Sequence, residues 1–304
     1  MEPYRRRAAR RKGNGMGQKT QGRQVTLGIA AAMTAALLFT GMDVCAKALP
    51  RLGAGEITFL RGAIGLAFLP FIARREGRRV FSGLDRLTLH LRGFTGGLGI
   101  LLFFFSLEGL KLGDAEILTE LSAFFMCLLA PFFLRNNPGR EVALPLGIIA
   151  AGAAVVLQVW HFDSFNGYAL FGLGSALSSA LAYICIGRLT EEPGRHSGTE
   201  LVFYFQFYSM LCGAALLPFG FVWPEGAEWL WVLGLSVTAI SAQMVFTWGC
   251  QHAHSLIISF VMYTAILFHI LAGWLFWGEV LTLSSWAGGA AIVGGSALLL
   301  WRTR

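Results

Sequence analysis

The chain has 304 residues, of which 55% are hydrophobic and 13% charged, and its formal net charge is +7. Soluble domains carry roughly 25% charged residues, so this composition excludes an ordinary soluble domain. The net charge does not indicate nucleic acid, because the cations are sorted into the tail and particular loops. The five cysteines lie in apolar stretches without a CxxC pair, so we expect neither a disulfide framework nor a zinc site, and no cofactor.

Residues 1–24 form a basic tail without an apolar core of its own, so we do not expect a signal peptide there. We expect a disordered cytoplasmic tail that helps to set the orientation of the chain in the membrane.

After the tail, ten apolar stretches fill nearly all of the chain. A helix needs about 20 mostly apolar residues to cross ~30 Å of hydrocarbon, and each stretch is long enough. The predicted spans are 25–49, 55–73, 90–110, 115–134, 142–160, 167–189, 199–222, 227–250, 254–277 and 282–301. The sequence therefore predicts an all-α membrane protein with ten transmembrane helices.

Lysine and arginine are unevenly distributed between the two sides that these spans define. Twenty of them fall on the side of the tail, with Arg92 at the start of the third span among them. Only Arg51 and Lys111 fall on the other side. The positive-inside rule then places both termini in the cytoplasm, in a multi-pass protein of the inner (cytoplasmic) membrane.

Glycine is abundant, with 38 residues. Glycines allow membrane helices to approach closely. We expect packing faces at Gly96-Gly97, Gly288-Gly289 and Gly294-Gly295.

Two segments of the chain match each other five spans apart. Glu56-Ile57-Thr58-Phe59 opens the second span, and Glu200-Leu201-Val202-Phe203 opens the seventh. Both spans end in Leu-Pro-Phe, at 69–71 and 217–219. An odd number of spans per copy turns the second copy upside down, which is typical of alternating-access transporters.

Several motifs now resemble a known family. They are Gly41-Met42-Asp43, Phe59-Leu60-Arg61, Leu91-Arg92-Gly93, Leu112-Gly113-Asp114-Ala115, Met262-Tyr263-Thr264-Ala265 and Gly278-Glu279. In this order and spacing the chain resembles the EamA-type branch of the drug/metabolite transporter superfamily over about residues 25–302. The resemblance implies two five-helix inverted repeats, 25–160 and 167–302, and movement of a small metabolite across the cytoplasmic membrane, often outward.

The sequence lacks two prolines that are common in the family pattern. Glu120-Leu121-Ser122-Ala123 stands where the fourth helix of other members often has one, and Phe260 where the ninth often has one. We therefore expect the kinks that other members use in gating to be missing.

Five ionisable residues lie well inside the predicted spans of the first repeat, all in the half away from the tail: Asp43, Lys47, Arg61, Glu116 and Glu120. Charges in hydrocarbon are costly and persist mainly where they face water or a partner. One interpretation is a structural network in which Arg61 pairs with Asp43 or Glu120 and Lys47 reaches the interface. Asp114 would then cap a helix whose first turn contains Glu116.

The other interpretation is functional and centres on Glu120. Glu116 and Glu120 share one helix face four residues apart, so they repel each other. Burial also disfavours the charged form, so we expect one of the two to hold a proton. Such a carboxylate could carry a coupling proton or balance a cationic substrate group, with Arg61 as its counter-charge.

The second repeat offers polar and aromatic groups in place of charges. The candidates for substrate contact are Tyr183, Gln243, Trp248 and Tyr263, with Gln206, His269 and Trp274 also inside spans. Stacking surfaces with a few polar groups suit an amphipathic organic ligand. We expect a central cavity lined by the first, third, fourth, sixth, eighth and ninth helices.

These observations favour a secondary transporter, and by the resemblance an exporter, that moves a small amphipathic organic metabolite such as an amino acid or related amine. Its expected partners are this substrate and membrane lipid, with protons as a candidate coupling ion and no nucleic acid. An intramembrane enzyme and a non-transporting receptor remain alternatives. The chain contains no GxSxG, HExxH or Walker motif.

Overall fold

The computed structural model describes residues 26–76, 82–134, 143–157, 166–190, 192, 195–252, 258 and 261–302. Within these ranges all regular secondary structure is helical and no strand occurs. The basic tail lies outside them, so the expectation of disorder there stays a prediction.

Each predicted span coincides with a helix or a pair of helices. The helices are Thr26–Lys47, α2 (Ala54–Glu76), α3 (Arg86–Leu107), α4 (Leu112–Thr119), α5 (Ser122–Leu134), α6 (Ala143–Leu157), α7 (Tyr168–Thr190), α8 (Gly198–Ala214), the short 3₁₀ helix η3 (Leu217–Phe219), α9 (Glu228–His252), α11 (Thr264–Trp277) and α12 (Leu283–Arg302). Among the described residues, six helices are by length and composition able to cross a membrane.

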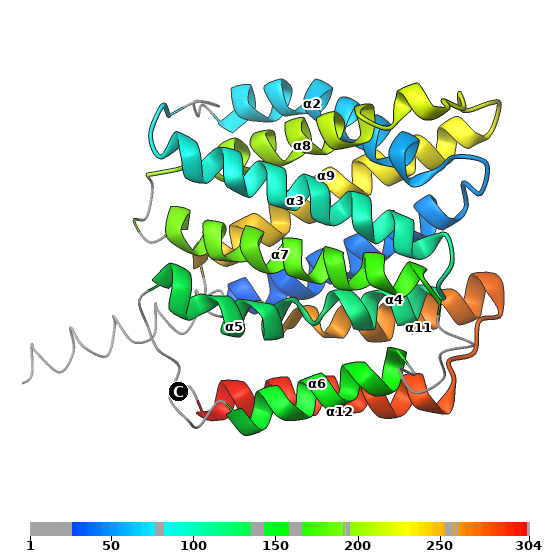
Figure 1. Cartoon of the computed structure of the whole chain (residues 1–304). Coiled ribbons are helices and arrows are strands. Elements are labelled where there is room, and N and C mark those ends of the chain that lie inside the picture. The colour runs from blue at the N-terminus through cyan, green and yellow to red at the C-terminus, as the bar shows by residue number, and fades with distance from the viewer. Residues whose placement is uncertain are drawn as a thin grey trace, which may run out of the picture.

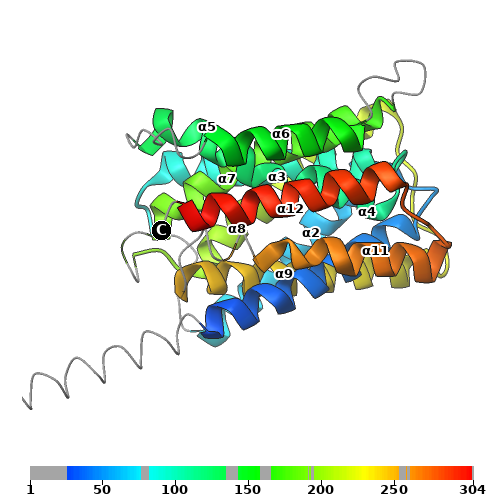
Figure 2. The same ribbon diagram turned by 90° about the horizontal axis from the view of Figure 1, so that it is seen from below.

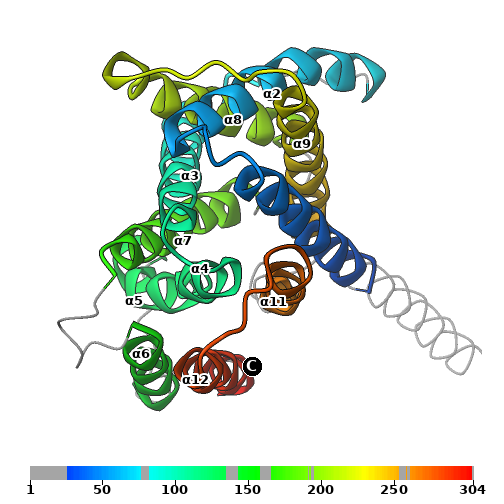
Figure 3. The same ribbon diagram turned by 90° about the vertical axis from the view of Figure 1, so that its right-hand side faces the viewer.

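The helices run side by side along one common direction (Figure 1). The packed pairs are α2 with α8, α3 with α7 and α8, α4 with α11, and α6 with α12. From below, α12 crosses the view between α6 and α11 (Figure 2), and end-on the α6–α12 pair lies beside the remaining helices (Figure 3). Helices distant in the chain are therefore neighbours in space.

Glycines make these close contacts possible. A methyl group at Gly62 of α2 would lie 2.5 Å from the backbone nitrogen of Met210 in α8. One at Gly288 of α12 would lie 2.5 Å from the carbonyl oxygen of Gly152 in α6. The expected packing glycines face neighbours in the same way, except Gly294, which has nothing within 4 Å of the corresponding position, so that expectation was wrong.

The fourth predicted span is broken, contrary to the expectation from its missing proline. α4 ends at Thr119, Glu120 and Leu121 form a turn, and α5 begins at Ser122. The hydroxyl of Tyr263 donates a hydrogen bond to the main-chain oxygen of Glu120, 3.2 Å away. A side-chain donor from another helix thus satisfies a carbonyl at the break, which is a recognised alternative to proline as the cause of a helix interruption.

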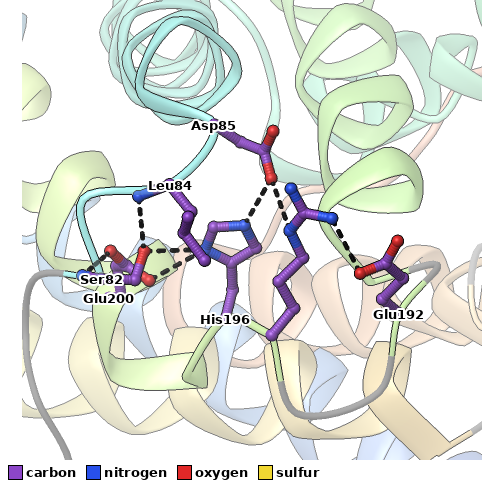
Figure 4. Close-up of polar contacts among 7 residues, drawn as sticks. Ser82, Leu84, Asp85, Glu192, His196 and Glu200 are labelled. Carbon is purple, nitrogen blue, oxygen red and sulfur yellow. Dashed lines mark hydrogen bonds and ion pairs between the residues drawn. The ribbon is translucent and has the colours of Figure 1, made fainter.

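A polar network joins the segments that precede α3 and α8 (Figure 4). The buried ring of His196 contacts Asp85 Oδ2 and Glu200 Oε2, each at 3.0 Å. Glu200 Oε1 also accepts a hydrogen bond of 2.7 Å from the amide of Ser82. Arg195 pairs with Asp85 at 2.9 Å. The His196 hydrogen bond, with Arg195 beside it, lowers the pKa of the Asp85 carboxyl from its ordinary value.

The glycine contacts predict a specific loss of stability. We expect Gly62→Ala to destabilise the protein by about 1–3 kcal/mol, because its methyl group meets backbone atoms of α8 that cannot move independently. Gly187→Ala in α7 is the control, since nothing lies within 4 Å of the added methyl group. Thermal unfolding in detergent measures both. Equal melting temperatures for the two variants would contradict the role given to Gly62.

Candidate functional site

A cavity of about 120 Å³ lies among the helices. Its lining comes from the helix Thr26–Lys47, α3, α4, α7, α8 and α9, with Met262 just before α11. Five of these helices are among the six that the sequence analysis expected, Met262 represents the sixth, the ninth predicted span, and α8 adds Phe205. Asp43, Glu116 and Glu120, which we call the acidic cluster, all line this cavity.

Asp43 is bound by a histidine and not by an arginine. Its Oδ2 lies 2.9 Å from Nε2 of His269 in α11, and Glu116 Oε2 lies 3.8 Å from the same nitrogen. The exposed fractions of Asp43, Glu116 and His269 are 2%, 7% and 0%. Asp43 Oδ1 has no hydrogen-bond partner in the described part of the chain. The expected direct pairing of Arg61 with Asp43 or Glu120 does not occur among the described residues, and Arg61 acts on Asp43 only through its charge at longer range.

The orientation of the His269 ring is fixed from its other side. Nδ1 lies 2.8 Å from the carbonyl oxygen of Ala265 and 3.1 Å from the hydroxyl oxygen of Thr40. The Thr40 hydroxyl itself donates to the carbonyl of Ala36, at 2.9 Å. Both neighbours of Nδ1 are consequently acceptors, so Nδ1 carries a hydrogen and Nε2 faces the carboxylates.

Glu120 lies at the break between α4 and α5, with its side chain 8% exposed. Tyr263, whose hydroxyl reaches the Glu120 carbonyl, is also 2.6 Å from the hydroxyl of Ser296 in α12. Tyr263 is buried and is not among the residues that line the cavity. The structure therefore places Tyr263 behind Glu120, where it holds three helices together.

Two arginines flank Phe205 of α8. Cζ of Arg92 lies 4.8 Å from the ring centroid, and Cζ of Arg61 lies 4.9 Å from it. Both side chains are at least nine-tenths buried, and Arg92 lines the cavity. Arg61 Nη1 donates to Ser209 Oγ at 3.4 Å, whereas its Nε and Nη2 have no partner among the described residues.

Arg92 was wrongly grouped with the loop cations in the sequence analysis. α3 begins at Arg86, four residues before the predicted start, so Arg92 lies inside the helix. Gly96, one turn later, leaves the space that its guanidinium fills. Nε and Nη1 of Arg92 lack partners in the described part of the chain. These buried donors are available to a ligand.

The sequence analysis expected Lys47 to reach the interface alone. In the structure it pairs with Glu279. The other oxygen of Glu279 accepts a hydrogen bond of 2.9 Å from the amide of Leu112. α4 begins at Leu112, and Lys111 precedes it without a side-chain cap, so the predicted cap at Asp114 was also wrong. Glu279 thus ties the helix Thr26–Lys47, the start of α4 and the end of α11 together.

The remaining candidates divide between two places. Tyr183 and Gln243 line the central cavity. Trp248 is 40% exposed, stacks on His252 with ring centroids 3.9 Å apart, and lines a separate pocket beside Gly198. The structure therefore does not bring Trp248 to the site.

Apolar helices around a buried, charged cavity define a multi-pass membrane protein with a site for a small molecule. The EamA-like transporter family matches residues 26–158 and 166–301, so the chain belongs to this family. The family and the named relatives are transporters, not enzymes.

Similar proteins support this assignment. The pseudopaline exporter CntI of Pseudomonas aeruginosa is 32% identical over 269 residues, which cover 88% of this chain and 93% of that protein. A riboflavin transporter of Rhizobium johnstonii is 29% identical over 250 residues, 78% of each chain. A solved crystal structure aligns with a TM-score of 0.66 at 18% identity, over 91% of this chain and 98% of the other, and shows the likeness of fold.

Proposed function

We propose that this transporter exports a small zwitterionic metabolite, such as an amino acid or related amine, by alternating access. The observation that carries this proposal is the charge arrangement of the cavity. The acidic cluster and Arg92 line the same small space. A substrate ammonium would bind to the carboxylates, and a substrate carboxylate to the free guanidinium nitrogens of Arg92.

The size of the cavity and one relative support the finer parts of this proposal. A volume of about 120 Å³ is below the roughly 300–1,000 Å³ typical of drug-sized ligands, which favours a small metabolite. Outward transport is supported by the similarity to a protein named an exporter.

We further propose two inverted five-helix repeats, 25–160 and 167–302, that together form ten transmembrane helices. Helices at matching places in the two repeats pack together, namely α2 with α8, α4 with α11, and α6 with α12. The matching glutamates also have matching contacts. Glu56 accepts a hydrogen bond of 3.2 Å from the amide of Val222 beyond α8, and Glu200 one of 2.7 Å from the amide of Ser82 beyond α2.

In this arrangement we predict an inner-membrane protein with both termini in the cytoplasm. The sorting of lysine and arginine toward the side of the tail supports this orientation. A C-terminal green fluorescent protein fusion should fluoresce, and a C-terminal alkaline phosphatase fusion should be inactive. The reverse pattern would overturn the topology.

Transport in proteoliposomes tests the proposed substrate class. A thermal-shift screen of purified protein with amino acids, polyamines, nucleosides and riboflavin selects the compound, and radiolabelled flux of that compound follows. We expect an amino acid or related amine to be selected. Arg92→Lys should reduce its flux by at least about tenfold, because a lysine cannot match the planar donor pattern of the guanidinium.

Arg51→Gln provides the control for this measurement. Arg51 is a surface residue that pairs with Glu225 and Glu228, away from the cavity, so its variant should transport normally. Selection of riboflavin or a nucleoside alone, or equal flux in Arg92→Lys and the unaltered protein, would contradict the zwitterion proposal.

Proton coupling through Glu120 is the last part of the proposal. Its support is the position of Glu120, a buried carboxylate at a helix break that lines the cavity. We expect Glu120→Gln to abolish pH-driven uptake into vesicles while substrate exchange remains measurable. Glu192→Gln, at an exposed site, should change neither. Normal pH-driven uptake by the Glu120→Gln protein would eliminate this role.

A further inference from the structure

Asp43, Glu116 and His269, which we call the triad, place three ligand atoms close together inside the bundle. One side-chain atom of each lies within 4.8 Å of those of the other two. The atoms come from three separate helices, Thr26–Lys47, α4 and α11. From the triad we infer that the protein binds a divalent transition-metal cation in this cavity. The ion would use Asp43 and Glu116, two of the carboxylates that the proposed function gives to the substrate ammonium, so ion and ammonium would compete for them, and the metal site is tested without substrate.

The geometry suits a metal ion of the zinc type. Zn²⁺ binds imidazole nitrogen and carboxylate oxygen at about 2.0–2.2 Å, which places tetrahedral ligands roughly 3.3–3.6 Å from one another. The observed separations from His269 Nε2 are 2.9 Å to Asp43 and 3.8 Å to Glu116. Small side-chain adjustments would bring all three atoms to an ion. The imidazole nitrogen favours zinc and its neighbours in the first transition row over Mg²⁺ or Ca²⁺.

The surroundings of His269 are those of a metal ligand. A histidine that binds a metal through one nitrogen usually donates the other ring N–H to a carbonyl or similar acceptor. His269 Nδ1 has two such acceptors, Ala265 O and Thr40 Oγ1. Nε2 is consequently the nitrogen turned toward the two carboxylates.

The charges of the triad provide an independent argument. Two carboxyl groups and one imidazole lie together in a site that is more than nine-tenths buried, so the triad has more acidic than basic groups. Arg61 acts on Asp43 through its charge but makes no direct contact with the triad in the described part of the chain, since its hydrogen bond goes to Ser209. Asp43 Oδ1 remains without a partner among the described residues. Buried charges require pairing or metal coordination, and a divalent cation supplies the missing charge and the missing contact.

Asp43 and Glu116 also line the cavity. Three protein ligands with the fourth position facing a cavity is the arrangement of metal sites that keep a place for water or a small molecule. A second histidine cluster in the described chain differs in this respect. Asp85 and Glu200 approach opposite nitrogens of His196, so they cannot share one ion with that ring.

The test uses purified full-length protein in detergent, from which a chelator has first removed bound metal. Isothermal titration calorimetry then measures the binding of added Zn²⁺. We expect one Zn²⁺ per chain, no comparable binding of Mg²⁺, and weaker Zn²⁺ binding as the pH falls, because protons compete for the ligands. His269→Gln and Asp43→Asn should each weaken binding by more than about 100-fold, since loss of an outer-shell partner alone typically costs about 10–100-fold.

His90→Gln is the matched control, because His90 lies on α3 in contact with Tyr208, outside the triad, and should leave the Zn²⁺ affinity unchanged. Thermal unfolding identifies any variant that fails to fold. If His269→Gln does not fold, Asp43→Asn alone tests the site. The absence of stoichiometric Zn²⁺ binding, or equal affinity in the folded triad variants and His90→Gln, would overturn the inference.

The result is separable from the transport proposal. Flux of the selected substrate with no Zn²⁺ binding would reject only the metal site. Zn²⁺ binding without flux of any compound in the panel would support the metal site and reject only the transport proposal.

Discussion

The high cost of burying charge in a membrane protein is the constraint on which this structure depends. Each ionisable side chain inside the bundle either has a defined partner or faces the cavity. Lys47 meets Glu279, and Asp43 meets His269. The guanidinium of Arg92 lies over the ring of Phe205, and Arg92 also lines the cavity. Asp43 and Arg92 have polar atoms without partners in the described part of the chain and also line the cavity, so a ligand placed there would do most to lower the energy.

The sequence was sufficient to predict the helices, because the length of an apolar stretch is a local property. It was also sufficient to select Asp43, Glu116 and Glu120, since charge in a span is conspicuous. The partners could not be predicted in this way. Asp43 and His269 are 226 residues apart and meet only through the packing of two helices.

The position of Arg92 and the break at Glu120 were missed for related reasons. Arg92 is close to a helix end in the sequence, and only the actual start of α3 shows that it is inside the bundle. At the break, the carbonyl of Glu120 accepts a hydrogen bond from the hydroxyl of Tyr263, which is 143 residues away. A local signal such as proline is therefore not required for an interruption, and its absence in the sequence is weak evidence for a continuous helix.

Glu279 has a mechanical consequence. It fastens the helix Thr26–Lys47 to α4 and α11. Asp43, Glu116 and His269 come one from each of these three elements, so the contacts of Glu279 hold together the helices that carry the triad. Arg92 belongs to α3 and rests on Phe205 of α8, a separate pair of packed helices. If the substrate carries opposite charges, as we propose, the spacing of those charges would have to match the separation of the triad carboxylates from Arg92 across the cavity.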